Sequence, residues 1–353
     1  MLVILALTED ANRTDAEVAD IYNLKKGTVS SVRRRLLDAG AINYTYVPAF
    51  NRLGCEMIGF HYGSSNPAIG SDMKANHYME FCNSTPQVFF SIIGGGSVVM
   101  FTALRNATEY EAFLQRHNLF FTGPKTSTKA RLSSVLFPYA LSRGTYVPQF
   151  APLVNNYFQL DVPAPRGRPI KQAKIDPIEL TPTEKATLVS MVTDPAASDR
   201  EIASTVGLSR QAVTRIRNKL TDEGVLTKIC VPRLYRWGFE ICAIAHPLFS
   251  MEIPWEKRLR NQPREVAEQA FFTISKADEA VSNYMVAKFS QYSAQLENVL
   301  AWYHRMKALN EKTDISLFSL ERSTELRNFE YTQAVSHLLT PRKRPNDMTH
   351  DNI

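Results

Sequence analysis

The feature that most constrains this chain is an internal repeat with a constant offset of 184 positions. The match runs without a gap from Val3, paired with Thr187, to Phe60, paired with Ile244. Further on, Gln87–Ile92 resembles Gln269–Ile274 at an offset of 182. A repeat of this extent predicts two units of one architecture. Identical pairs include Asp15 and Asp199, Arg33 and Arg217, Leu36 and Leu220, Gly40 and Gly224, and Gly54 and Gly238.

Each copy contains a basic helical stretch, LKKGTVSSVRRRLL at 24–37 and LSRQAVTRIRNKL at 208–220. Apolar residues recur at i, i+3 and i+7, as Val29, Val32 and Leu36 do in the first copy, which predicts a helix with one buried stripe. The remaining surface is cationic and rich in hydroxyls and amides, without an acid. Such a surface suits a DNA groove. The alternative is a solvated basic face, and its occurrence in both copies favours DNA.

The flanking sequence predicts a winged helix-turn-helix in each copy. Helices are expected at 15–21 and 199–205, each beginning at an Asp suited to capping, and a short turn leads into the basic helix. Gly40 and Gly224 stand where a helix C-cap needs left-handed backbone. Strand-like runs at 41–47 and 225–231 then supply a wing. Residues 1–7 are interpreted as a shortened first helix.

Beyond each wing the pattern predicts a ferredoxin-like βαββαβ sandwich. The fold class is therefore α+β, with two copies of a winged helix-turn-helix followed by this sandwich. The expected elements are strands at 57–62, 88–93, 98–104 and 129–137 with helices at 72–83 and 108–117, then strands at 241–248, 270–274, 284–289 and 314–321 with helices at 255–269 and 292–307. The expected domains are 1–47 and 180–231 for the winged helices, 48–143 and 232–325 for the sandwiches, 144–179 for a linker, and 326–353 for a C-terminal helix and basic tail.

Bulk properties restrict the class of protein. Apolar residues make up 44% and the net charge is +6, the composition of a globular protein with moderate positive charge. Cys55, Cys82, Cys230 and Cys242 form no CxxC pair, which predicts buried thiols in a reducing cytosol. The short apolar start lacks a basic leader, so no signal peptide or membrane span is expected. None of the seven histidines forms a metal or catalytic motif, so no cofactor and no metal is expected.

The segments LSRQAVTRIRNKLTDEGVL and VPRLYRWGFE, followed by βαββαβ, resemble the Lrp/AsnC (leucine-responsive) family of transcription regulators. LKKGTVSSVRRRLLDAGAI and VPAFNRLGCE in the first copy are more diverged. The resemblance implies that the winged helices bind double-stranded DNA, and that the sandwiches self-associate and can hold an effector such as an amino acid. The DNA-binding residues it implies are Lys25, Lys26, Thr28, Ser31 and Arg34, with Ser209, Arg210, Gln211, Thr214, Arg215 and Asn218.

Two departures from that family matter. Its members usually carry one module per chain, so two modules here predict a built-in pseudo-dimer with two unlike reading helices. The family also has a glycine turn near its effector site. The first copy keeps Gly94, Gly95 and Gly96, and the second has Lys276-Ala-Asp-Glu instead. An effector is therefore expected near Gly94–Gly96, with a plain hairpin turn as the alternative.

The predicted linker contains Pro165-Arg166-Gly167-Arg168-Pro169, which resembles an AT-hook core. Arg166 and Arg168 would enter a narrow A·T minor groove, whose negative potential attracts arginine. The alternative is a merely basic linker.

The function expected from the sequence is a DNA-binding transcription regulator rather than an enzyme. Two rivals stay open. One is a tandem winged-helix protein that docks onto transcription machinery. The other is an enzyme like those that decarboxylate siroheme on this same architecture, although their His/Tyr/Arg runs are not found here.

Overall fold

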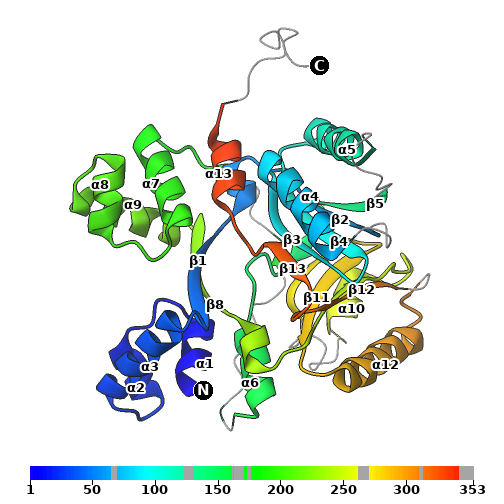
Figure 1. Ribbon diagram of the computed structural model, residues 1–353, viewed down its shortest axis with the longest axis horizontal. Helices are drawn as coiled ribbons and strands as arrows, with labels where there is room; N and C mark the ends of the chain where they lie inside the picture. Colours follow the sequence, from blue (N-terminus) through cyan, green and yellow to red (C-terminus); the bar gives the residue numbers. More distant parts are fainter. Residues whose placement is uncertain are drawn as a thin grey trace.

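The computed structural model describes residues 1–64, 70–122, 131–160, 162, 171–172, 176–260, 270–309 and 313–341. Within these residues the chain forms two helical heads on one side and two stacked sheets on the other (Figure 1). The AT-hook-like segment with Arg166 and Arg168, and the basic tail after residue 341, lie outside the described residues. Among the described residues, every helix is too short or too polar to cross a membrane.

Each head is a three-helix unit. The first contains α1 (Leu2–Glu9), α2 (Asp15–Ile21) and α3 (Lys26–Asp38), and the second contains α7 (Pro182–Thr193), α8 (Asp199–Val206) and α9 (Arg210–Asp222). Capping boxes begin three of these helices, because a Ser or Thr hydroxyl accepts from the third backbone N–H and the glutamate there accepts from the cap N–H. The cap and glutamate pairs are Thr14 with Glu17, Thr181 with Glu184, and Ser198 with Glu201.

An ion pair fastens the second helix of each head to the third. Arg33 Nε lies 2.9 Å from Asp15 Oδ1, and Arg217 Nη2 lies 2.6 Å from Asp199 Oδ1. These four residues form two of the pairs that are identical at the offset of 184 positions, and their side chains are about a quarter exposed or less. The repeated Asp and Arg therefore set the angle between two helices. They are not free for a ligand.

The two wings pair with each other. Strand β1 (Ile42–Pro48) runs antiparallel to β8 (Leu226–Pro232), with Ile42 opposite Pro232 and Pro48 opposite Leu226. The centre of this ribbon is the pair Thr45 and Ile229, which are themselves 184 positions apart. Since the register is symmetric about that pair, the ribbon relates the heads by a local pseudo-twofold axis.

The α+β fold class is confirmed: a ferredoxin-like sandwich follows each head. In the first, β2 (Met57–Ser64), β3 (Val88–Gly94), β4 (Ser97–Leu104) and β5 (Arg131–Pro138) form the order β3-β4-β2-β5. In the second, β9 (Ile241–His246), β10 (Ala270–Ser275), β11 (Ala280–Val286) and β12 (Asp314–Ser319) form β12-β9-β11-β10. The accompanying helices are α4 (Ser71–Ser84), α5 (Ala107–Thr122), α10 (Trp255–Arg260) and α12 (Phe289–Arg305).

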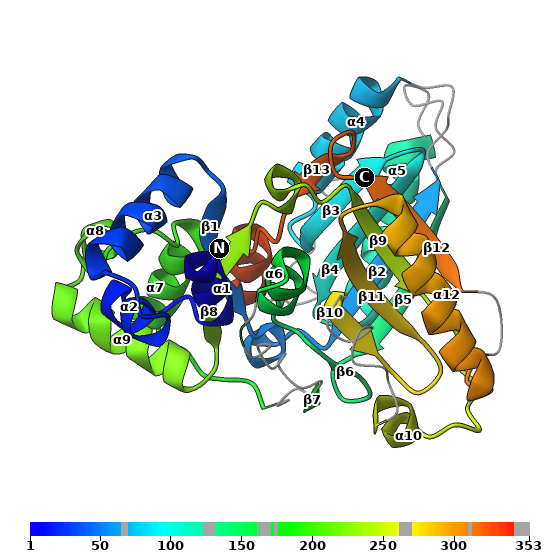
Figure 2. The same ribbon diagram turned by 90° about the horizontal axis from the view of Figure 1, so that it is seen from below.

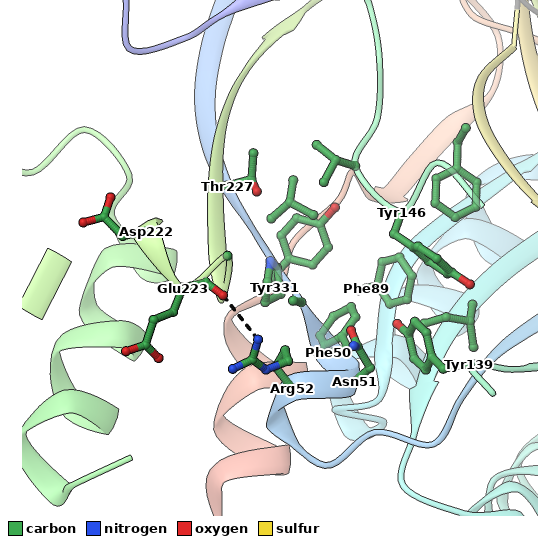
Figure 3. A pocket seen from close by; sticks show the side chains of 17 residues that line it. Phe50, Asn51, Arg52, Phe89, Tyr139, Tyr146, Asp222, Glu223, Thr227 and Tyr331 are labelled. Atoms are coloured by element: carbon green, nitrogen blue, oxygen red, sulfur yellow. Dashed lines mark hydrogen bonds between the residues drawn. The ribbon is translucent and has the colours of Figure 1, made fainter. Parts of the chain in front are cut away.

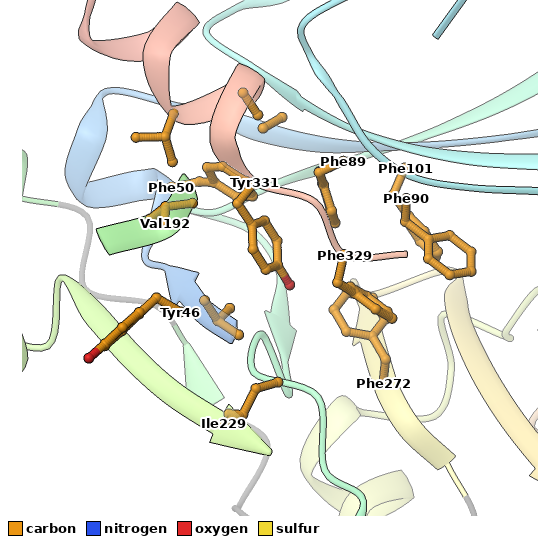
Figure 4. Packing of buried hydrophobic residues seen from close by; sticks show 14 of the residues in the cluster. Tyr46, Phe50, Phe89, Phe90, Phe101, Val192, Ile229, Phe272, Phe329 and Tyr331 are labelled. Carbon is orange, nitrogen blue, oxygen red and sulfur yellow. The ribbon is translucent and has the colours of Figure 1, made fainter. Parts of the chain in front are cut away.

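The two sheets lie next to each other (Figure 2), and their inner faces share one aromatic core (Figure 4). Phe101 of the first sheet meets Phe272 of the second edge-to-face, with ring centroids 5.3 Å apart. Phe90 and Phe329 extend this contact at 4.8 Å. Each buried aromatic ring contributes about 2 kcal/mol or more through lost apolar surface. The sheets are therefore joined by a continuous core.

The segment expected to be a linker contains helix and strand, although its sequence lacks periodicity. It contains β6 (Arg143–Gly144), α6 (Ala151–Phe158) and β7 (Lys171–Gln172), and the two short strands extend the second sheet. Ala151 and Val154 of α6 are buried against Ile4 and Leu5 of α1. The segment between the halves thus packs against the first head.

The end of the second half crosses to the first. Strand β13 (Thr324–Arg327) pairs with β3, and α13 (Thr332–Leu339) packs near α7. Arg327 is buried, and its guanidinium donates to the carbonyl oxygens of Val88 and Cys82, each at 2.7 Å. Strand β13 and the hydrogen bonds of Arg327 therefore attach the end of the second half to the first sandwich.

Candidate nucleic-acid interface

Helix α9 presents a polar face to solvent because its apolar stripe is buried. Val213, Ile216 and Leu220 pack into the head core. Arg210, Gln211, Arg215 and Asn218 are exposed, and together with Thr214 they border one open hollow of the surface. Five of the residues expected to bind DNA are therefore gathered on one helix face.

Two hydroxyls expected in the second interface already have partners within the head. Ser209 is the N-cap of α9 and accepts from the Ala212 N–H at 3.2 Å. The Thr214 hydroxyl donates to Asp199 at 2.5 Å and also lies 3.1 Å from the Arg210 carbonyl. Thr214 is only half-exposed. These hydroxyls stabilise α9 within the head, while its arginines and amides extend to solvent.

Helix α3 exposes all five residues expected in the first interface, namely Lys25, Lys26, Thr28, Ser31 and Arg34. Arg34 Nε is 3.8 Å from Asp38, and both side chains are largely exposed. Such a pair contributes little and is readily exchanged for a phosphate. The helix packs less deeply than α9: Val29 is buried, but Val32 and Leu36 are half-exposed.

The electrostatics of the N-termini separate α3 and α9 from α2, α7 and α8. The first turns of α2, α7 and α8 carry acids, which the helix dipole favours. The first turns of α3 and α9 have none, and each begins at a cation, Lys26 or Arg210. A cation there opposes the dipole, so both ends would be complemented by an external anion such as a phosphate.

Helices α3 and α9 are called the reading helices below. An arginine from each half contacts the C-terminal end of the reading helix in the other half. Arg52 Nη1 donates to the carbonyl of Glu223 at 3.3 Å, and Arg236 donates to the carbonyl of Ala39. Both carbonyls belong to helix C-caps, where positive charge is favourable. The two arginines are 184 positions apart, so their shared place in the repeat was the one sequence signal for this clamp.

Glycines close both reading helices. Gly40 has φ +58° and Gly224 has φ +67°, which confirms the left-handed C-caps. Gly94, Gly95 and Gly96 instead make the hairpin turn between β3 and β4. A Cβ on Gly94 would lie 2.1 Å from Ser323 Oγ, so this turn is packed against the second half. It lines neither the cavity beside Phe50 nor the smaller cavity beside Leu234.

The histidines do not gather at one site. His61 is buried, with Ser134 and Thr102 oxygens 2.8 Å from its two ring nitrogens. Burial, with a smaller contribution from His117, lowers the pKa of His61 to about 3. His246 lies elsewhere, with its ring nitrogens 3.1 Å from the Tyr62 hydroxyl and 2.8 Å from Glu279. No group of three or more metal-ligating side chains occurs among the described residues.

All four cysteines lie in described parts of the chain, where they are buried and free of disulfides. Burial raises the pKa of Cys82 to about 11 and that of Cys230 and Cys242 to about 12. The thiols therefore remain protonated and belong to the core, as expected from the sequence.

Comparison with known proteins defines the class. Residues 180–227 match the family model described as winged helix-turn-helix DNA-binding. That range covers α7 to α9 and the start of β8, so the second head is a winged-helix domain of the DNA-binding class. No curated protein matches the chain.

Among solved structures, the siroheme decarboxylase NirDL has a TM-score of 0.53 at 12% identity, over 96% of this chain and 97% of that one. Its complex with an iron-uroporphyrin III analogue gives 0.50 at 11% identity, with the same coverage. The transcriptional regulator NMB0573/L-Met complex from Neisseria meningitidis gives 0.33 at 12% identity, over 40% of this chain and 90% of that one.

The expectation that this chain is not an enzyme is contradicted by the full-length comparison. The structure similar along nearly the whole chain, with both modules, is that of an enzyme. Its low identity shows a shared fold and no more. A two-module winged-helix architecture is therefore compatible with enzymatic activity, and the basic helices do not exclude it.

Proposed function

We propose that the chain is a sequence-specific DNA-binding transcription regulator of Lrp/AsnC type, in a tandem-duplicated form with two unlike reading helices. The observation that carries the proposal is the exposed face of α9 with Arg210, Gln211, Arg215 and Asn218, inside a winged helix-turn-helix of the DNA-binding class. The equivalent face of α3 supports a second contact with the same DNA. The β1–β8 ribbon holds the two heads in a fixed relation.

The side chains divide by role. Lys25, Lys26, Arg210 and Arg215 contact phosphates or guanine edges, because their charged side chains are exposed in the N-terminal half of each helix. Gln211 and Asn218 discriminate bases, since side-chain amides form paired hydrogen bonds with adenine. Thr28, Ser31 and Arg34 in the first head, with Ser209 and Thr214 in the second, complete the interface.

The proposal also includes the finer expectations from the sequence. One chain acts as a pseudo-dimer and selects an asymmetric site with two unlike half-sites. Arg166 and Arg168 add a minor-groove contact between the heads, Gly94–Gly96 marks an effector-responsive turn, and further self-association runs through the sandwiches. Selection of bound DNA in vitro tests the half-site arrangement: palindromic sites bound by one chain would contradict it.

The direct test is the salt dependence of duplex binding. The double variant Arg210→Ala/Arg215→Ala should weaken binding and flatten the slope of log K against log salt by about 0.9 for each lost phosphate contact. The matched control is Lys288→Ala/Arg322→Ala, which removes the same charge from exposed positions in the second sandwich. Equal slopes for the two variants, or no binding by the unmodified chain in dilute buffer, would refute the proposal.

A second candidate function is an enzyme resembling the siroheme decarboxylase. The observation in its favour is the network in which the Tyr62 hydroxyl bridges Asp314 and His246, and His246 in turn meets Glu279. These groups come from both halves and could transfer a proton. Titration with an iron-uroporphyrin analogue, followed in the Soret region and by mass spectrometry for decarboxylation, tests it. His246→Ala should abolish any turnover by this network.

A further inference from the structure

A cavity of about 460 Å³ lies where the second head meets the first sandwich (Figure 3). The first half contributes Val47–Arg52 and Phe89 to its walls. The last turn of α9 and the following loop, residues 222–224, form the opposite wall, and Tyr331 comes from the C-terminal segment. The cavity therefore touches a reading helix, a sandwich and the segment that joins them.

Aromatic rings dominate the interior. Phe50, Phe89, Tyr139, Tyr146 and Tyr331 all line it. The Phe89 and Tyr331 rings are stacked with centroids 5.6 Å apart, and Tyr139 and Tyr146 are tilted at 5.0 Å. The buried Tyr146 hydroxyl has no hydrogen-bond partner among the described residues.

The rim is more negative than positive. Asp222 and Glu223 are both exposed at the C-terminal end of α9, where the helix dipole adds partial negative charge. The opposing cation, Arg52, donates to the Glu223 carbonyl (Figure 3). Two carboxylates and a helix C-terminus stand against one guanidinium, so the net charge of the rim is negative. Aromatic faces with a negative rim favour a cation.

The equivalent place in the second half holds a much smaller cavity, and the described residues that line it include none from the first head. Around Leu234, the counterpart of Phe50, the cavity measures about 30 Å³. Arg233 stands there at the position equivalent to Ala49, and Tyr235 at that equivalent to Asn51. The fold therefore does not require an open cavity at this place.

We propose that the open cavity binds an organic cation, an amine or quaternary ammonium with an aromatic or apolar body. The body lies among Phe50, Phe89 and Tyr331, and the positive group lies toward Asp222 and Glu223. Because one wall is the last turn of α9, occupancy shifts the second reading helix and alters DNA binding. This coupling, unlike the binding itself, rests on the proposed function.

The experiment is calorimetric titration of the full chain with benzyltrimethylammonium, compared with benzyl alcohol as a neutral analogue and phenylacetate as an anionic one. The cation should bind at least about tenfold more tightly than either, a difference of about 1.4 kcal/mol. Equal affinity for the three compounds, or tightest binding of phenylacetate, would overturn the proposal.

Two variants locate the site. Asp222→Asn/Glu223→Gln should weaken cation binding about tenfold, whereas Asp38→Asn, at the equivalent end of α3, should leave it unchanged. Ala49→Arg places a long cationic side chain in the wall of the cavity and should abolish binding, with its folding checked by circular dichroism. Unchanged cation affinity in Ala49→Arg would place the ligand elsewhere and refute the assignment.

Coupling is measured separately by duplex binding with and without benzyltrimethylammonium. A change of about threefold or more in the unmodified chain, absent in Ala49→Arg, supports coupling. Cation binding by calorimetry with unchanged DNA affinity would overturn the coupling alone. A chain that binds the cation but no duplex at all would instead contradict the proposed regulator function.

Discussion

The two reading helices occupy equivalent places, yet they differ in how they are held and in what they expose. Helix α9 buries its whole apolar stripe, whereas α3 buries Val29 alone and leaves Val32 and Leu36 partly exposed. At positions where α9 has Gln211 and Asn218, α3 has Gly27 and Arg34. A firmly packed helix with amides suits base discrimination, and a looser, more cationic one suits phosphate contact.

The largest expected effect comes from the buried stripe. Leu220→Ala should cost about 3 kcal/mol of head stability, because Leu220 is fully buried and its removal leaves a cavity. Leu36→Ala, at the equivalent half-exposed position, should cost about half as much. Hydrogen exchange of α7–α9 and α1–α3 measures each head by itself. Equal losses would show that the heads are packed alike.

Base discrimination should depend mainly on the second head. Gln211→Gly/Asn218→Arg gives α9 the residues of α3 and should reduce selectivity by about 1–3 kcal/mol for each lost paired contact. Non-specific affinity should not fall, because the variant gains a positive charge. Competition between selected and random duplexes measures the ratio. If the variant kept its selectivity, the bases would be discriminated by α3 or by the linker and not by α9.

The sandwiches should differ in their response to acid. Burial lowers the pKa of His61 to about 3 and that of His117 to about 4, whereas the position equivalent to His61 in the second half is Ala245. The unfolded chain takes up these protons below about pH 6.5 and the folded chain does not. Stability of the first sandwich should therefore fall as pH drops from about 6.5 to 5, by about 1.4 kcal/mol per pH unit for each histidine.

Hydrogen exchange in β2 and β4, compared with β9 and β11, measures this difference. Protection should decrease in the first pair between pH 7 and 5 and change less in the second. Similar losses in both sheets would mean that groups common to the halves, such as the carboxylates, control acid stability.

The local elements of this fold could be predicted, because each depends on neighbouring residues. The spacing of Val213, Ile216 and Leu220 predicted α9, and Gly40 and Gly224 predicted the helix ends. Of the expected interface, the structure finds the arginines and amides exposed but Thr214 bonded to Asp199. Residue type alone did not reveal which polar side chains form hydrogen bonds within the head.

The contacts between the halves were not predicted, because periodicity carries no information about which distant segments pair. Thr324–Arg327 joins the first sheet through the buried Arg327, although it follows the second sandwich in sequence. Helix α6 was missed because its apolar residues pair with α1 over a long sequence separation. The cavity beside Ala49 and the smaller one beside Arg233 likewise have walls made of segments that are distant in sequence.

The smallest expected effect tests whether the halves hold each other's reading helices. Arg236 belongs to the second half in sequence, but it donates to the C-cap carbonyl of α3. Arg236→Ala should therefore lower protection in α3 by about 1 kcal/mol and leave α9 unchanged, since a cation at a helix C-terminus contributes about that much. Arg52→Ala should do the reverse, through the carbonyl of Glu223. If each substitution loosened the head of its own half instead, the arginines would act by local packing, and the heads would be independent of the opposite sandwich.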